Sequence, residues 1–228
     1  MIKSRLRDFL RWHVTLPLRD ETSEVLYQGL FPQQCANAGI RNDFYPVGGA
    51  ANYSLMYVLC RILTERDVKS IVEVGSGQTT ILIDRVRSPS ARHVCYEHDP
   101  VWYADISRRL MRCDYRLRPL ERRSSDAGHA LDAYADIELL DFDLLLVDGP
   151  PGGDRYSRFA CIDLIAASRL PDYAIVFDDA KRGGERETIE HAVSMLRGPG
   201  VDLAVSELHA RKRHAIVSVG RFRAVSHC

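Results

Sequence analysis

Acidic side chains follow three apolar segments of this 228-residue chain, at positions where they could bind a ligand. Glu97 follows the segment "HVCY", Asp148 follows "LLLV", and Asp178 and Asp179 follow "AIVF". The carboxyl ends of parallel strands meet at one edge of a sheet, and α/β proteins bind their ligands there. One carboxylate in such a place can accept hydrogen bonds from both hydroxyls of a ribose, so Glu97 predicts binding of a nucleoside.

A turn with two glycines interrupts the apolar sequence "SIVEVGSGQTTILI" of residues 70–83. Gly75 and Gly77 allow the backbone to turn sharply and to approach a ligand closely. The dinucleotide-binding fingerprint has a third glycine where this chain has Thr80, so the diphosphate of NAD fits this turn less well. Glu73 lies inside the apolar segment, where a carboxylate needs a cationic partner or several hydrogen bonds.

Asp148, Asp178 and Asp179 are predicted to face one crevice. Like charges at such short range must be neutralised, either by protonation or by a cation. Hard divalent cations such as Mg²⁺ bind carboxylate oxygens, so the group predicts a metal site. In the alternative interpretation the aspartates cap helices and form ion pairs with basic residues that are close in the sequence: Arg155, Lys181 and Arg182.

Asp126 lies in the sequence "SSDAGHALDAY", for which we predict a cap followed by a short helix within residues 124–134. Its carboxylate could accept a hydrogen bond from the amino group of adenine. It could equally well cap the N-terminus of the helix.

The acidic residues can meet only if the apolar segments form neighbouring strands. Short apolar runs alternate with helical periodicity from residue 69 onward, which predicts a parallel sheet with helices on both faces. The basic turn "HARKR" between the last two strands is too short for a crossover and requires antiparallel pairing. We therefore expect an α/β, doubly wound, mostly parallel seven-stranded sheet with one antiparallel strand. The expected strands are 69–75, 93–97, 114–120, 142–148, 173–179, 201–208 and 214–220, and the expected helices are 51–63, 78–87, 101–111, 154–169 and 185–196.

Residues 1–50 are predicted to be an N-terminal extension or lid, followed by a ligand-binding α/β domain over 51–228. The segment "FPQQCANAGIRNDFYPVGG" is expected to be loop-like. The first eighteen residues are basic and amphipathic, which favours a docking helix or a frayed terminus over a helix on a membrane surface.

Bulk composition excludes several classes of partner. The formal net charge is zero, so no global charge attracts nucleic acid. Six cysteines are scattered singly, which predicts free thiols and a cytoplasmic location. No apolar stretch is long enough to span a bilayer. A homodimer could form through residues 55–63 or through the last two strands.

Together these motifs resemble class I S-adenosylmethionine-dependent methyltransferases over about residues 52–220. "VEVGSGQTT" is similar to the first motif of that family and "YEHD" to the second. The resemblance implies a class I methyltransferase-like Rossmann fold with S-adenosylmethionine as cofactor. It also implies cofactor-binding roles for Glu73, Gly75, Ser76, Gly77, Glu97, His98, Asp126 and Asp148.

Within the family, the chain looks most like cation-dependent O-methyltransferases of the catechol and the glucuronoxylan or sugar types. "VDGPPGGDRYSRF" and "VFDDAKRGGE" are similar to the sugar type, so a saccharide is favoured over a phenol as acceptor. The resemblance implies a divalent cation, with Mg²⁺ expected, on Asp148, Asp178 and Asp179. The catechol type has a lysine base where this chain has Pro151. The catalytic base is therefore sought among Asp148, Lys181 and Asp154, and residues 154–158 and 44–57 are expected to shape the acceptor pocket.

Two other classes remain open from the sequence. An NAD-dependent oxidoreductase would use the same strand-end carboxylate, although Thr80 and Glu73 argue against it. A non-catalytic nucleoside-binding protein on the same fold would bind the nucleoside with no dependence on a divalent metal.

Overall fold

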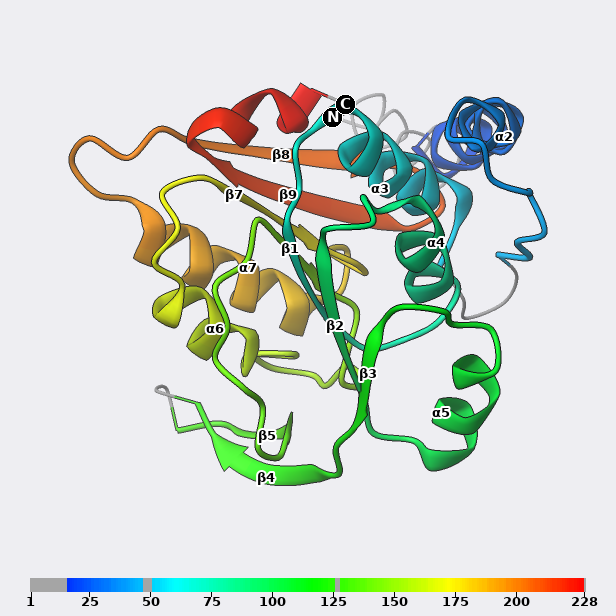
Figure 1. The fold of residues 1–228 in the computed structure, drawn as a ribbon. Coiled ribbons are helices and arrows are strands. Elements are labelled where there is room, and N and C mark those ends of the chain that lie inside the picture. Colours follow the sequence, from blue (N-terminus) through cyan, green and yellow to red (C-terminus); the bar gives the residue numbers. More distant parts are fainter. Residues whose placement is uncertain (1–15, 47–50, 126–127, 228) are drawn as a thin grey trace, which may run out of the picture.

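A seven-stranded sheet forms the centre of the computed structural model, which describes residues 16–46, 51–125 and 128–227 (Figure 1). The strand order is β3-β2-β1-β6-β7-β9-β8, and β9 runs antiparallel to both of its neighbours. This arrangement confirms the predicted fold class. The strands are β1 (Ser70–Val74), β2 (Arg92–Glu97), β3 (Asp114–Leu117), β6 (Leu144–Val147), β7 (Tyr173–Phe177), β8 (Leu203–His209) and β9 (Arg213–Val219).

Helices cover both faces of the sheet, as the apolar strands require. Alternate residues of β6 and β7 point to opposite faces, so each strand contributes to two separate apolar clusters. One cluster includes α6 and α7, and the other includes α3 and α4 (Figure 1). The helices are α2 (Leu16–Asn37), α3 (Tyr53–Glu65), α4 (Gln78–Val86), α5 (Pro100–Ser107), α6 (Cys161–Ala167) and α7 (Gly183–Leu196), followed by the 3₁₀ helix η2 (Gly220–His227).

The helix predicted within residues 124–134 is wrong. The structure has an antiparallel hairpin there, formed by β4 (Leu120–Ser124) and β5 (Ala130–Tyr134). Leu131 and Ala133 alternate with exposed residues and are buried, which is the period-two pattern of a strand. Pairing with β4 therefore outweighs the helical propensity of the alanines and Leu131.

The predicted loop that begins at Phe31 is also wrong in its first part. Residues 31–37 belong to α2, which continues past Pro32 and buries Phe31 and Cys35 against α3. α3 is covered by this contact, so its apolar face lies in the core and is not the dimer surface that the sequence had suggested. The helix predicted over residues 154–169 begins later than expected, since α6 starts at Cys161. Residues 154–160 form bends and turns beside the strand ends.

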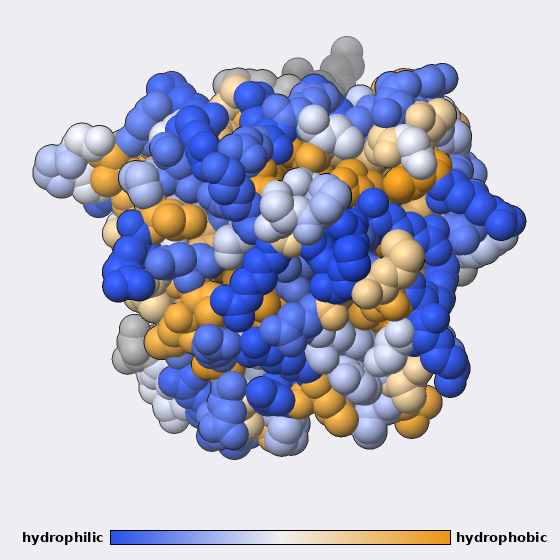
Figure 2. Space-filling model, in the orientation of Figure 1, coloured by the Kyte–Doolittle hydropathy of each residue, from blue (hydrophilic) through white to orange (hydrophobic). Residues whose placement is uncertain are grey.

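Polar and charged side chains cover most of the face shown in Figure 2, and apolar side chains form small groups between them. Within the described residues, every helix is too short or too polar to cross a bilayer.

Candidate functional site at the strand ends

Two strand-end turns touch each other at the centre of the sheet. Gly75 follows β1 and Gly149 follows β6, and these strands are neighbours. A Cβ atom on Gly75 would lie 2.6 Å from the backbone nitrogen of Gly149, and the φ of Gly75 is +88°. Gly75 is therefore required for contact between two turns. Gly77 is different, because a Cβ there would meet only the Trp102 ring at 3.9 Å.

Two cavities lie beside these turns, and four residues line both: Ser76, Trp102, Asp148 and Pro151. The first, which we call the Glu97 cavity, has a volume of about 380 Å³. The second, the Arg182 cavity, has a volume of about 620 Å³. The Glu97 cavity is lined by Ser76, Glu97, His98 and Tyr134 among others, and the Arg182 cavity by Ser76, Gly77, Gln78, Arg158, Asp179 and Arg182 among others.

The Glu97 carboxylate is held rigidly at the end of β2. One oxygen accepts hydrogen bonds from the backbone nitrogens of His98 (2.7 Å) and Asp99 (2.9 Å). The other accepts from the Ser76 hydroxyl at 2.6 Å. These donors fix the carboxylate against the glycine turn, as expected for a group that binds a polar ligand.

The structure shows the partners of the Glu73 carboxylate, which the sequence did not identify. Its side chain is fully buried, and its two oxygens contact the Thr79 hydroxyl at 2.6 Å and the His93 Nε2 at 3.0 Å. It lines neither cavity. The carboxylate thus ties β1 to α4 and β2, and it can influence a ligand only through the turn that it supports.

Tyr134 is a site residue that sequence analysis missed. It ends β5, is 2% exposed and lines the Glu97 cavity. Its hydroxyl has no hydrogen-bond partner among the described residues. Burial, together with the nearby Glu97 carboxylate, raises the pKa of Tyr134 well above its ordinary value, so the hydroxyl stays a donor. A buried donor without a partner is costly unless a ligand accepts from it.

The three aspartates do come together, with ligand atoms within 4.8 Å of one another. Burial and then the neighbouring Asp178 carboxylate raise the pKa of Asp148 well above its usual value. Burial opposes ionisation of Asp178 too, but contacts with His214 and Lys212 outweigh it and hold the Asp178 pKa far below the usual range. One carboxylate of this pair is therefore fixed as an anion and the other is free to take up a proton.

Basic side chains neutralise this cluster. Arg158 lies 3.1 Å from Asp179 and 3.5 Å from Asp148, and Arg182 lies 3.0 Å from Asp179. Arg158 is 5% exposed and also donates to backbone carbonyl oxygens at the ends of β6 and β7. Asp179 and Arg182 thus form one of the ion pairs that the alternative interpretation of the sequence predicted.

The backbone around the cluster is strained. Arg158 and Asp179 have φ values of +60° and +59°, and Tyr156 has a φ of +45°. Such conformations are rare for residues other than glycine and are stabilised only where the surroundings enforce them. Nothing in the sequence indicated this backbone strain. The sequence indicated Arg158 only through its place in residues 154–158, which were expected to shape the acceptor pocket.

A divalent cation fits the charges of this cluster poorly. Asp178 is fully buried, lines neither cavity and has both oxygens engaged by His214 and Lys212. Both oxygens of Asp179 also have basic partners. An added Mg²⁺ would have to displace these partners.

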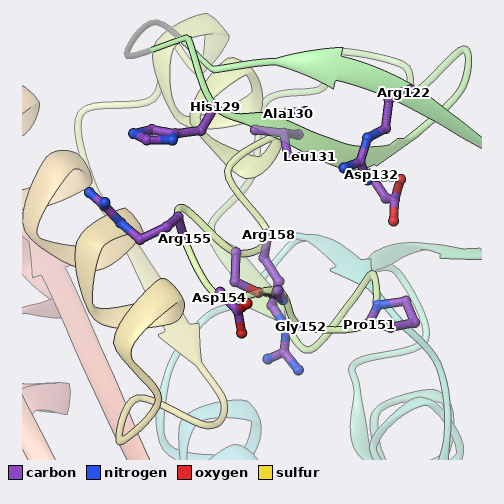
Figure 3. A pocket seen from close by; sticks show the side chains of 12 residues that line it. Arg122, His129, Ala130, Leu131, Asp132, Pro151, Gly152, Asp154, Arg155 and Arg158 are labelled. Atoms are coloured by element: carbon purple, nitrogen blue, oxygen red, sulfur yellow. Dashed lines mark hydrogen bonds and ion pairs between the residues drawn. The ribbon is translucent and has the colours of Figure 1, made fainter.

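The other predicted base residues lie away from this crevice. Lys181 is exposed and lines neither cavity. Asp154 lines a separate cavity of about 310 Å³ between the β4–β5 hairpin and the turn after β6 (Figure 3). His129 and Arg155 lie at one end of that cavity, while the Arg158 guanidinium points away from the hairpin (Figure 3). Asp148 alone of the three candidates lies between the two cavities. Asp126 and residues 47–50 are outside the described residues.

Comparison with known proteins adds evidence on the fold. No protein-family model and no curated protein matches the chain. Solved structures do: an O-methyltransferase from Bacillus cereus in complex with SAH is 16% identical, with a TM-score of 0.51 over 96% of this chain and 100% of that one. The O-methyltransferase TomG from Streptomyces achromogenes, involved in tomaymycin synthesis and in complex with SAM, is 13% identical, with a TM-score of 0.50 over 88% and 97%. A methyltransferase from Geobacter sulfurreducens is 17% identical, with a TM-score of 0.50 over 85% and 87%. These likenesses confirm the class I methyltransferase-like Rossmann fold.

The two glycines of the turn should respond differently to the same substitution. Gly75→Ala forces a left-handed alanine into backbone atoms of the next turn, and we expect a loss of at least about 2 kcal/mol in unfolding free energy. That loss corresponds to a drop in Tm of about 5 °C or more. Gly77→Ala has room and should keep its Tm. Thermal unfolding of both variants measures this, and equal Tm values would contradict the assignment of Gly75 to turn packing.

Proposed function

We propose that this chain is an S-adenosylmethionine-dependent O-methyltransferase that acts on a small hydroxylated acceptor. The observation that carries the proposal is the pair of cavities joined at Asp148. One has the buried carboxylate expected for a ribose, and the other is large enough for a second molecule. The fold is shared with O-methyltransferases whose structures contain SAM or SAH, which supports the choice of nucleoside.

The Glu97 cavity supplies the groups that a nucleoside needs. Glu97 would accept hydrogen bonds from the ribose hydroxyls, with His98 beside it at 2.9 Å. Tyr134 would donate its unpaired hydroxyl to the bound cofactor. Ser76 and the bare backbone of Gly77 would border the methionine end. Asp126 is proposed as the adenine contact on the sequence resemblance alone.

Chemistry would take place where the two cavities meet. S-adenosylmethionine supplies an activated methyl group, so the protein mainly positions the acceptor and removes a proton. The acceptor oxygen forms the new O–CH₃ bond as the S–CH₃ bond breaks, and the hydroxyl proton passes to a base. Asp148 is the best-placed base, since it borders both cavities and has a raised pKa.

The acceptor class follows from the walls of the Arg182 cavity. Arg158, Asp179 and Arg182 present a wall rich in donors and acceptors. Such a wall suits a sugar with several hydroxyls better than a flat phenol, so we favour a saccharide. A divalent cation is left out of this proposal, because the carboxylates that the motifs assigned to it already have basic partners.

Cofactor identity can be tested by calorimetry. The wild-type protein should bind S-adenosylmethionine and not NAD. Glu97→Gln should weaken that binding by about tenfold or more, because an ionised acceptor for two hydroxyls is lost. The exposed Glu190→Gln on α7 is the matched control and should bind like wild type. Binding of NAD in place of S-adenosylmethionine would point to the oxidoreductase alternative.

Tyr134→Phe should separate stability from binding. Removing a buried hydroxyl that has no partner should leave the Tm of the free protein unchanged or slightly raised. Affinity for S-adenosylmethionine should fall about fivefold, the cost of one hydrogen bond. Differential scanning fluorimetry and calorimetry on the same preparation measure both, and a lower Tm with unchanged affinity would mean that the hydroxyl is structural.

The role of Asp148 predicts a pH dependence. A base with a raised pKa is increasingly ionised as pH rises, so kcat/KM should rise with pH through that pKa and then level off. Asp148→Asn should lower kcat/KM by about a hundredfold or more and remove the rising limb. SAH release with a panel of monosaccharides and catechols finds the acceptor first. An unchanged pH profile in Asp148→Asn would assign the base elsewhere.

A further inference from the structure

Asp178 lines neither cavity, although its carboxylate lies close to that of Asp148. Its side chain is fully buried although it directly follows β7. One oxygen is 2.8 Å from the His214 Nδ1, and the other accepts a hydrogen bond from the Lys212 Nζ at 3.0 Å. The same ammonium lies 3.6 Å from Asp179. The Lys212 ammonium therefore places a positive charge of the protein itself beside two of the three clustered carboxylates.

The reversed direction of β9 explains how this charge gets there. Phe177 of β7 pairs with Ala215 of β9, so β9 begins where β7 ends. The Ala180 nitrogen donates to the Arg213 carbonyl oxygen at 2.8 Å, which holds the β8–β9 turn against the segment after β7. Lys212 and His214 flank Arg213 and so reach the strand ends. If this strand ran parallel to β7, its first residues would lie at the opposite end of the sheet, away from the carboxylates.

A second row of side chains holds Asp178 in this orientation. The His214 Nε2 lies 3.1 Å from the Ser54 hydroxyl, and that hydroxyl donates to Glu24 of α2 at 3.0 Å. His214 is 1% exposed, Ser54 is 0% and Glu24 is 8%. Asp178 cannot turn toward the crevice without breaking the contact with His214.

Further ion pairs extend this arrangement. The buried Glu185 lies 3.8 Å from Arg158 and 3.4 Å from Arg182, so four carboxylates share three basic side chains. A divalent cation could bind Asp178 or Asp179 only by displacing an ammonium or guanidinium group that these carboxylates already contact, which is costly in a mostly buried place.

We propose that the Lys212 ammonium is the built-in cation of this centre. It takes the electrostatic role that a divalent metal would have on the three carboxylates, so the protein works without one. Lys212 is a positioning residue: it holds Asp178 and Asp179 in place behind the crevice. The inference concerns the charge of the centre, and its main readout, metal binding to the free protein, does not depend on the proposed methyl transfer.

The test is a titration of Mn²⁺ against the full-length protein, followed by the electron paramagnetic resonance signal of free Mn²⁺. Wild type should bind no stoichiometric Mn²⁺ in the micromolar range. Lys212→Met keeps the length of the side chain and removes the charge, which leaves the carboxylates undercompensated. We expect it to gain a site for one Mn²⁺, with affinity at least about tenfold higher than wild type. Lys212→Arg should behave like wild type.

Lys69→Met is the matched control. Lys69 is exposed and immediately precedes the first residue of β1, at the end of the strand opposite to the carboxylates. It should bind Mn²⁺ no better than wild type. Tight Mn²⁺ binding by wild type would overturn the proposal, as would a folded Lys212→Met variant with no gain. If Lys212→Met does not fold, the wild-type titration still decides. Calorimetry with S-adenosylmethionine, with and without EDTA, reports separately on the proposed function: binding that requires the metal contradicts this inference, and no binding in either condition contradicts only the function.

Discussion

Direct contact between the backbones of Gly75 and Gly149 determines the shape of the site. Neither turn could carry a side chain there, because a Cβ on either residue would lie within 2.7 Å of the other's backbone. The contact brings the turns after β1 and β6 together, and both glycines line the Glu97 cavity. Asp148 immediately precedes Gly149 and is thereby placed on the wall that the two cavities share. This packing therefore fixes the position of a carboxylate that lines both cavities.

Charge is the second constraint on this edge of the sheet. Three carboxylates meet there because three residues follow two neighbouring parallel strands. Such a group is stable only with compensation, and the fold provides it from two directions. Arg158 and Arg182 approach from the segments after β6 and β7, and Lys212 approaches from the antiparallel hairpin. The result is a polar centre in which each of the three carboxylates has a basic side chain within 3.5 Å.

Much of this architecture could be predicted from local patterns. The succession of strands and helices, the mostly parallel sheet and the antiparallel pairing of the last two strands followed from continuous apolar runs, from helical periodicity and from the short basic turn before β9. The position of Glu97 followed from its place after an apolar strand. Prediction failed where long-range pairing decided the outcome. Residues 130–134 have the composition of a helix, yet they pair with β4, and residues 31–37 have the composition of a loop, yet they pack on α3.

The sequence by itself determined which strands carry acidic ends and therefore at which end of the sheet these carboxylates gather, because side-chain period and turn length are local properties. It offered Arg182, which lies beside Asp179 in the structure, as an ion-pair partner, but it did not show the partners of Asp178. Lys212 and His214 are more than thirty residues from Asp178, and Ser54 and Glu24 are farther still. Only the tertiary structure brings them together, since the reversed β9 returns a basic turn to the end of β7. It also decided that Asp178 faces inward, because the orientation of a buried charge depends on partners from distant segments of the chain.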